Sequence, residues 1–140
     1  MRLLAVLVVT VLLAACGGTP DSPTSTDGPD YTPVPDQDLF QQVRQIDGVT
    51  TVDLGYADHF GNSSAYQGEV TVTAGTDELA TLDHVIAVLR QGRQDATMNV
   101  SLSSPTRTVT ALTLGVRTLE QLNQRYGEQP GNGEPPAELP

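Results

Sequence analysis

Apolar residues recur with regular spacing only in the middle of the chain, over residues 36–127. The first regular segment has a helical repeat, which predicts an amphipathic helix capped by Asp36 and closed by Gly48. A second helical repeat begins near Thr76 and runs to about Gly92. The apolar stripes of the two helices consist of Leu39, Phe40, Val43 and Ile46, and of Leu79, Leu82, Val85, Ile86 and Leu89.

Four segments alternate between apolar and polar residues, which predicts half-buried strands. Two of them, residues 49–56 and 66–73, lie between the helices, and two more follow the second helix. The fourth, residues 108–114, alternates ambiguously because Val109 and Leu112 are both apolar, so we expect a bulge or two buried faces there. The residues expected to face inward are Val52, Leu54, Tyr56, Val70, Val72, Met98, Val100 and Leu102.

A short last helix is expected after Thr118, which forms a capping box with Gln121. Its apolar face consists of Leu119, Leu122 and Tyr126. The element order is then α-β-β-α-β-β-α, which predicts an α+β fold with a single antiparallel four-stranded sheet, two helices on one face and a short C-terminal helix. The same order also fits two α-β-β units in tandem.

The phrase Ile46-Asp47-Gly48-Val49 and the first five elements resemble ferredoxin-like domains, notably small heavy-metal-associated domains. The resemblance implies an α/β plait, but the metal-binding Cys-x-x-Cys of those domains is missing. Their first strand is missing too, and we expect residues 108–114 to fill its slot, as in a permuted ferredoxin-like plait. The resemblance therefore implies a fold and no metal function.

The two ends of the chain differ in composition from the middle. Residues 17–35 and 128–140 are rich in Pro, Gly, Ser, Thr and acidic residues, so they have too little apolar surface to offset the entropy of ordering. We expect a leader over residues 1–15, a disordered linker over 16–35, an α+β domain over 36–127, and a disordered acidic tail over 128–140.

The leader has a short positive start at Arg2 and an apolar run over residues 3–13, which is too short to cross a bilayer. The run ends in Leu13-Ala14-Ala15-Cys16, which resembles the lipobox of bacterial lipoproteins. That resemblance implies cleavage before Cys16, a diacylglyceryl group on its thiol, and often an acyl chain such as palmitate on its amine. We therefore expect an extracytoplasmic protein that is lipid-anchored to a bacterial membrane, with the cell membrane favoured. The alternative is a secreted protein in which Cys16 is coincidental.

Net charge and cysteine count narrow the function classes. The formal charge is −10, and all seven basic residues are Arg. A surface this acidic argues against nucleic-acid binding and against electrostatic docking on anionic lipid. The single cysteine, Cys16, excludes an intramolecular disulfide, so the domain depends on packing alone.

Candidate chemistry is concentrated in the long polar loop between Ala57 and Ala65. Asp58 and His59 lie there and could bind a cation or small ligand, together with Asp53 or Glu69. These residues are too few for a defined metal site, and the chain lacks G-x-S-x-G, S-x-x-K and phosphate-loop motifs. We therefore assign no catalytic residues, no metal ligands and no cofactor.

The sequence favours a non-enzymatic envelope lipoprotein whose domain binds another protein or serves as a scaffold. The bilayer, contacted through Cys16, and an envelope protein are the expected partners. A small-ligand or cation receptor that uses the loop between Ala57 and Ala65 is the alternative, and a hydrolase ranks third.

Overall fold

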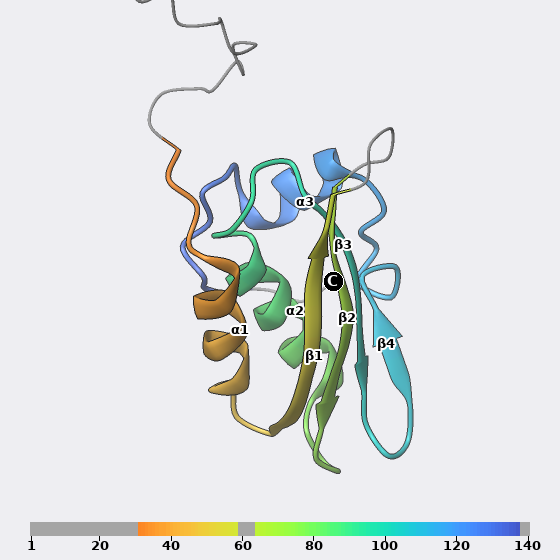
Figure 1. Cartoon of the computed structure of the whole chain (residues 1–140). Helices are drawn as coiled ribbons and strands as arrows, with labels where there is room; N and C mark the ends of the chain where they lie inside the picture. The colour runs from red at the N-terminus through yellow and green to blue at the C-terminus, as the bar shows by residue number, and fades with distance from the viewer. Residues whose placement is uncertain (1–30, 59–63, 138–140) are drawn as a thin grey trace, which may run out of the picture.

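The computed structural model describes residues 31–58 and 64–137 and has the element order that the sequence predicts (Figure 1). This order confirms the α+β fold. The helices are α1 (Asp36–Arg44), α2 (Glu78–Leu89) and α3 (Leu119–Tyr126). The strands are β1 (Val49–Ala57), β2 (Ala65–Val72), β3 (Thr97–Ser103) and β4 (Thr108–Thr110).

The four strands form one sheet in the order β1-β2-β3-β4. β1–β2 and β3–β4 are antiparallel hairpins, but β2 and β3 are parallel, so the prediction of an antiparallel sheet is wrong. The reason is the connection, because α2 carries the chain back across the sheet between β2 and β3. The permuted plait is also wrong, since β3 lies directly beside β2 and leaves no slot for β4. The hairpins are not a translated repeat either, because β1 and β3 run in opposite directions.

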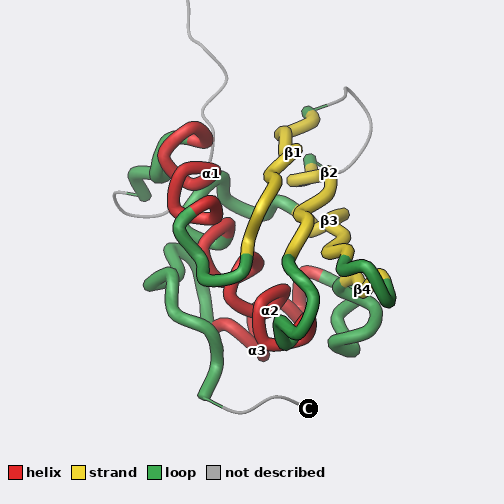
Figure 2. The backbone as a smooth tube through the Cα atoms, turned by 90° about the horizontal axis from the view of Figure 1, so that it is seen from below, coloured by secondary structure: helices red, strands yellow, loops and turns green. Residues whose placement is uncertain are grey.

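α1 and α2 lie on the same side of the sheet, which Figure 2 shows most clearly. Between them and the sheet lies a single core, to which the inward-facing residues of β2 and β3 contribute as predicted. α2 is buried almost all round, because other parts of the chain cover the sides that do not face the sheet. The most deeply buried large apolar side chains are Leu39, Val43, Tyr66, Val70, Leu82, Val85, Ile86, Leu89 and Leu102.

The helix starts differ in how they are capped. Asp77 caps α2 with its side chain, and the predicted capping box of Thr118 and Gln121 is present at α3. The prediction that Asp36 caps α1 is wrong, because Pro35 is the N-cap residue and has no side-chain donor or acceptor. The Asp36 carboxylate instead accepts a hydrogen bond from the Tyr66 hydroxyl at 2.8 Å.

The domain extends beyond residues 36–127 at both ends. Before α1, Val34 packs against the core and its N–H donates to the carbonyl of Gln91 at 3.0 Å. After α3, the predicted free tail makes defined contacts: the Gln129 amide donates to the carbonyls of Arg90 and Arg93, and the Gly131 N–H also donates to Arg90. The last carbonyls of a helix lack partners within it, and these tail groups supply donors to the end of α2.

Candidate functional site

β4 is much shorter than the predicted strand over residues 108–114. After Thr110 the chain folds into tight turns, in which Thr113 donates to Thr110 and both Leu114 and Val116 donate to Ala111. These turns bury Ala111, Leu114 and Val116 and leave Leu112 61% exposed. The ambiguous alternation of the sequence therefore marks the end of a strand and not a bulge or a strand with two buried faces.

The early end of β4 leaves the first half of β3 paired with β2 on one side and without a strand on the other. β4 pairs with residues 101–103 of β3, and its last partner is Ser101. The Thr97 N–H donates to Ser64 on the β2 side, so the alternation of backbone groups along a strand turns those of Met98 to the opposite side. Met98 lies beyond the end of β4, and its N–H and C=O therefore face an open edge.

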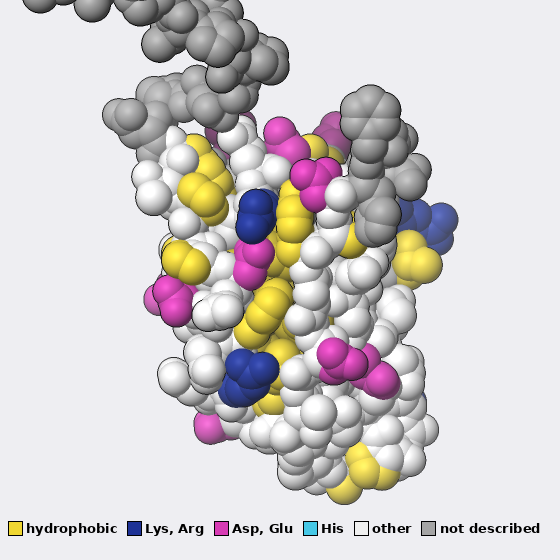
Figure 3. All heavy atoms as spheres, in the orientation of Figure 1, with side chains coloured by type: hydrophobic (Ala, Val, Ile, Leu, Met, Phe, Trp, Pro, Cys, Tyr) yellow, Lys and Arg dark blue, Asp and Glu magenta, His cyan; other side chains and the backbone are white. Residues whose placement is uncertain are grey.

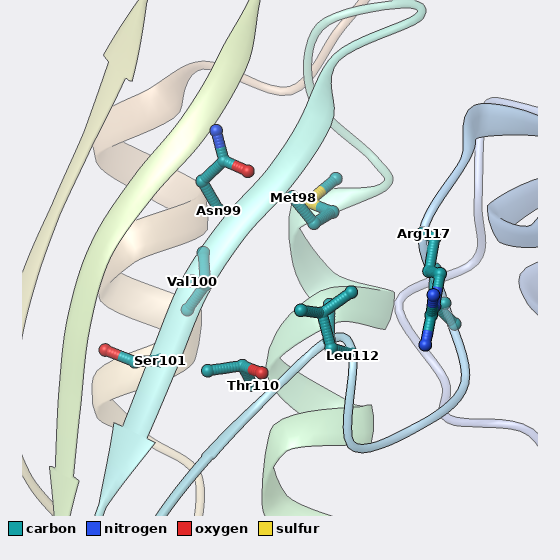
Figure 4. Close-up of a pocket in the computed structure, with 9 residues that line it drawn as sticks. Met98, Asn99, Val100, Ser101, Thr110, Leu112 and Arg117 are labelled. Carbon is teal, nitrogen blue, oxygen red and sulfur yellow. The ribbon is translucent and has the colours of Figure 1, made fainter.

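A groove of about 340 Å³ runs along this open edge (Figure 4). A narrower extension of about 50 Å³ continues it to Thr97 and Leu122. In Figure 4, Met98 and Leu112 point into the gap, and Arg117 lies across it from β3. We call this the β3-edge groove; it is lined by Thr97, Met98, Asn99, Val100, Ser101, Thr110, Ala111, Leu112, Val116, Arg117, Thr118 and Leu122.

The groove has an apolar floor and one charged residue. Arg117 is exposed, and it is not a member of the three ion pairs seen among the described residues. Its backbone N–H donates to the Gln121 side chain at 2.7 Å, which fixes the backbone next to α3. Among the residues that the structure describes, no carboxylate lines the groove, so the Arg117 guanidinium is available to an anionic group from outside.

A buried ion pair holds α3, whose Leu122 lines the groove, against α2. Asp83 of α2 accepts two hydrogen bonds from the Arg125 guanidinium, at 2.8 and 2.7 Å, and a third from the Tyr126 hydroxyl at 2.6 Å. Burial and the bond to Asp83 raise the pKa of Tyr126, and the same carboxylate raises the pKa of Arg125. The Asp83 side chain is only 1% exposed, so α3 is tied to α2 by a fully paired buried charge.

Arg90 is a second buried cation, at the C-terminal end of α2. One of its nitrogens, Nη2, donates to the Asn123 side chain at 2.7 Å and to the Gly127 carbonyl at 2.6 Å. Its Nε and Nη1 have no hydrogen-bond partner within residues 31–58 and 64–137. Burial lowers the pKa of this guanidinium. Together with Asp83, Arg90 ties the C-terminal half of α3 to α2.

The other edge of the sheet, along β1, differs in character. Figure 3 shows a strip of apolar side chains between α1 and β1, flanked by basic and acidic ones. At this edge the Arg93 guanidinium lies 4.5 Å from the centre of the Tyr56 ring and pairs with Asp36 at 3.0 Å. The pairing of β1 with β2 shifts register between Val49 and Thr51, and Asp53 is an exposed charge on the strand. Charges and bulges of this kind protect edge strands from further pairing.

The residues singled out from the sequence do not form a cluster in the described parts. Asp58 is exposed at the end of β1, and His59 lies outside the described residues, as do Leu13, Ala14, Ala15 and Cys16. Asp53 and Glu69 face each other across β1 and β2. In residues 31–58 and 64–137 no three His, Cys, Asp or Glu residues gather as metal ligands would. The receptor hypothesis stays a prediction, which calorimetry on H59A and D58A variants would test.

Sequence reasoning did not find the β3-edge groove. The available signal was Leu112, whose position disagrees with the alternation that begins at Val109. Arg117 gave no signal, because its role depends on which strand lies across from it.

Comparison with protein-family models, with curated proteins and with solved structures found no significant match. Among the helices of the described segments, none has the length and apolarity that crossing a bilayer requires.

Proposed function

We propose that this chain is a lipid-anchored lipoprotein of the bacterial envelope, and that its domain is a non-catalytic module that binds another protein at the β3-edge groove. Leu13-Ala14-Ala15-Cys16 supports the anchor, because small residues before a cysteine suit peptidase cleavage and thioether lipidation. A single acyl chain holds a protein only marginally, so two or three chains on Cys16 provide the durable attachment.

The open edge of β3 is the observation that carries the binding role. Met98 presents unpaired backbone groups there, and Leu112 beside it is the one large apolar side chain that is mostly exposed within residues 31–58 and 64–137. An unpaired strand edge next to apolar surface is a template for association with another chain. Because the linker begins at Cys16, the anchored domain can meet partners at a membrane surface.

The anchor is tested on protein from a bacterial host. We expect the intact mass to correspond to a chain that begins at Cys16 and carries acyl groups, and we expect the protein in the membrane fraction. A Cys16→Ser variant should keep its leader or leave the membrane. Mature wild-type protein with an unmodified Cys16, free of the membrane, would contradict the anchor.

The binding role is tested with a photo-crosslinking amino acid at one position at a time in the anchored protein. Position 112 should yield a discrete crosslinked protein, and position 51 on β1 should not. Thr51 is a matched control, because it is exposed on the opposite edge of the same sheet. Equal crosslinking from both positions, or none from position 112, would contradict a binding role for this groove.

A further inference from the structure

We propose that the occupant of the β3-edge groove is an extended segment of a partner protein that adds a short strand to β3 and places a carboxylate against Arg117. This inference rests on the proposed binding role and specifies the chemistry of the partner. Such a segment needs three features of the groove: backbone groups that pair with its own, apolar contacts for its alternate side chains, and a cation for an acidic side chain.

The length of the open edge sets the length of the bound segment. Four residues of β3, 97–100, have no β4 partner. At about 3.3 Å per residue this edge spans about 13 Å, which accommodates four or five residues of an added strand. The end of β4 at Thr110 closes one end of the groove, so a longer strand cannot continue in that direction.

The two faces of the added strand meet different surroundings. Side chains on the inner face lie beside Met98 and Val100, which are buried, and across from Val116. Side chains on the outer face lie beside Asn99 and Thr110, which are polar. Because side chains alternate along a strand, the groove suits a segment that alternates apolar and polar residues.

Arg117 gives the positions that face it a preference for acidic residues. It lies across the groove from Met98 and has no carboxylate partner among the described residues (Figure 4). The net charge of −10 repels an acidic peptide at long range. At physiological ionic strength the Debye length is only about 8 Å, so the nearby guanidinium determines the local interaction.

A second copy of this chain fits the groove less well. It would bring another −10 charge to the interface. Within residues 31–58 and 64–137 no carboxylate lines the groove, so the same groove of a second copy offers no anionic partner to Arg117. The β1 edge is a poorer acceptor as well, because Arg93, Asp53 and the register shift near Thr51 oppose pairing there.

The test uses the full-length chain in mild detergent and a fluorescent capped peptide, Val-Glu-Val-Glu-Val, with binding followed by anisotropy. We expect saturable binding that weakens about threefold when glutamine replaces both glutamates, as for an exposed ion pair. Arg117→Gln should weaken binding of the glutamate peptide by the same factor and leave the glutamine peptide unchanged. Arg44→Gln is the matched control, since Arg44 is exposed on α1.

Strand pairing is tested separately with N-methylated peptides, which remove donors without changing the protein. Alternate amides of a strand face opposite sides, so methylation at positions 2 and 4, or at 3 and 5, should affect binding very differently. We expect one of the two peptides to bind at least about fivefold more weakly, because it loses hydrogen bonds to the edge.

Three results would overturn this inference: no saturable binding, equal effects of Arg117→Gln and Arg44→Gln, or equal effects of the two methylated peptides. Dimerisation of the free chain that Leu112→Arg abolishes and the peptide does not displace would also overturn it, in favour of a second copy. Crosslinking from position 112 to a different protein that persists alongside any of the first three results would leave the proposed function standing and remove only this inference about the bound segment.

Discussion

The β1 edge of the sheet and the open half of β3 differ in how well they are protected from further pairing. The β1 edge carries a register shift, an exposed carboxylate at Asp53, and Arg93 stacked on Tyr56. The open half of β3 has none of these features and faces a groove with an exposed Leu112. Proteins normally protect edges that have no use, so the contrast supports the proposal that a partner binds at the β3 edge.

The largest expected effect comes from breaking the buried ion pair that holds α3 against α2 beside the groove. Arg125→Met leaves the Asp83 carboxylate buried without its cation, and we expect it to lower the free energy of unfolding by about 3–5 kcal/mol. Chemical denaturation measures this loss. A loss below about 1 kcal/mol would show that this pair does not hold α3 in place. The side of the groove that α3 forms would then not be fixed.

Truncation of a leucine should lower the stability much more in the paired half of β3 than in the groove. Leu102 is fully buried beside β4, so Leu102→Ala should cost about 2–5 kcal/mol of stability. Leu112 is mostly exposed, so Leu112→Ala should change stability by less than about 0.5 kcal/mol and act only on binding. Comparable losses from both variants in thermal or chemical unfolding would mean that Leu112 is a core residue.

Alkaline pH should reversibly weaken the attachment of α3 to α2. The pKa of Tyr126 is raised in the folded protein, so neutral Tyr126 contributes stability that is complete below its ordinary pKa of about 10 and is lost as the pH rises above it. Tyr126→Phe removes a hydrogen bond to a carboxylate, which should cost about 1.5–3 kcal/mol at neutral pH. Its unfolding free energy should also fall less steeply above pH 10, whereas an unchanged slope would contradict this assignment.

Another small effect is expected at the β1 edge. Arg93→Gln removes an exposed ion pair with Asp36 and the contact with Tyr56, so we expect a loss of about 0.2–1 kcal/mol. The same variant should allow some crosslinking from position 51. If position 51 stays silent, Arg93 is not what protects the β1 edge.

Local patterns in the sequence predicted most elements, because they depend on neighbouring residues. The alternation of Met98, Val100 and Leu102 and the capping box of Thr118 and Gln121 both appear as expected. The tail was mispredicted because Gln129 and Gly131 are held by hydrogen bonds to α2 and not by apolar burial. Composition, which measures apolar surface, contains no record of such contacts.

The arrangement of strands and the groove could not be predicted in this way, because both depend on distant parts of the chain. The parallel pairing of β2 and β3 follows from the path of α2 across the sheet. The groove exists because β4 ends at Thr110, where backbone turns outcompete a longer strand. The spacing of Val109 and Leu112 indicated that the strand is irregular, but it did not indicate that a groove lies beside the strand.

Hydrogen exchange at two amides of β3 tests the central claim most directly. Leu102 faces Val109 of β4, so its N–H should exchange only on global unfolding. Met98 lies on the same side of the strand beyond the end of β4, so its N–H should exchange much faster in the free protein and become protected when the glutamate peptide is bound. If Met98 is as protected as Leu102 in the free chain, the edge is not open and the account is contradicted.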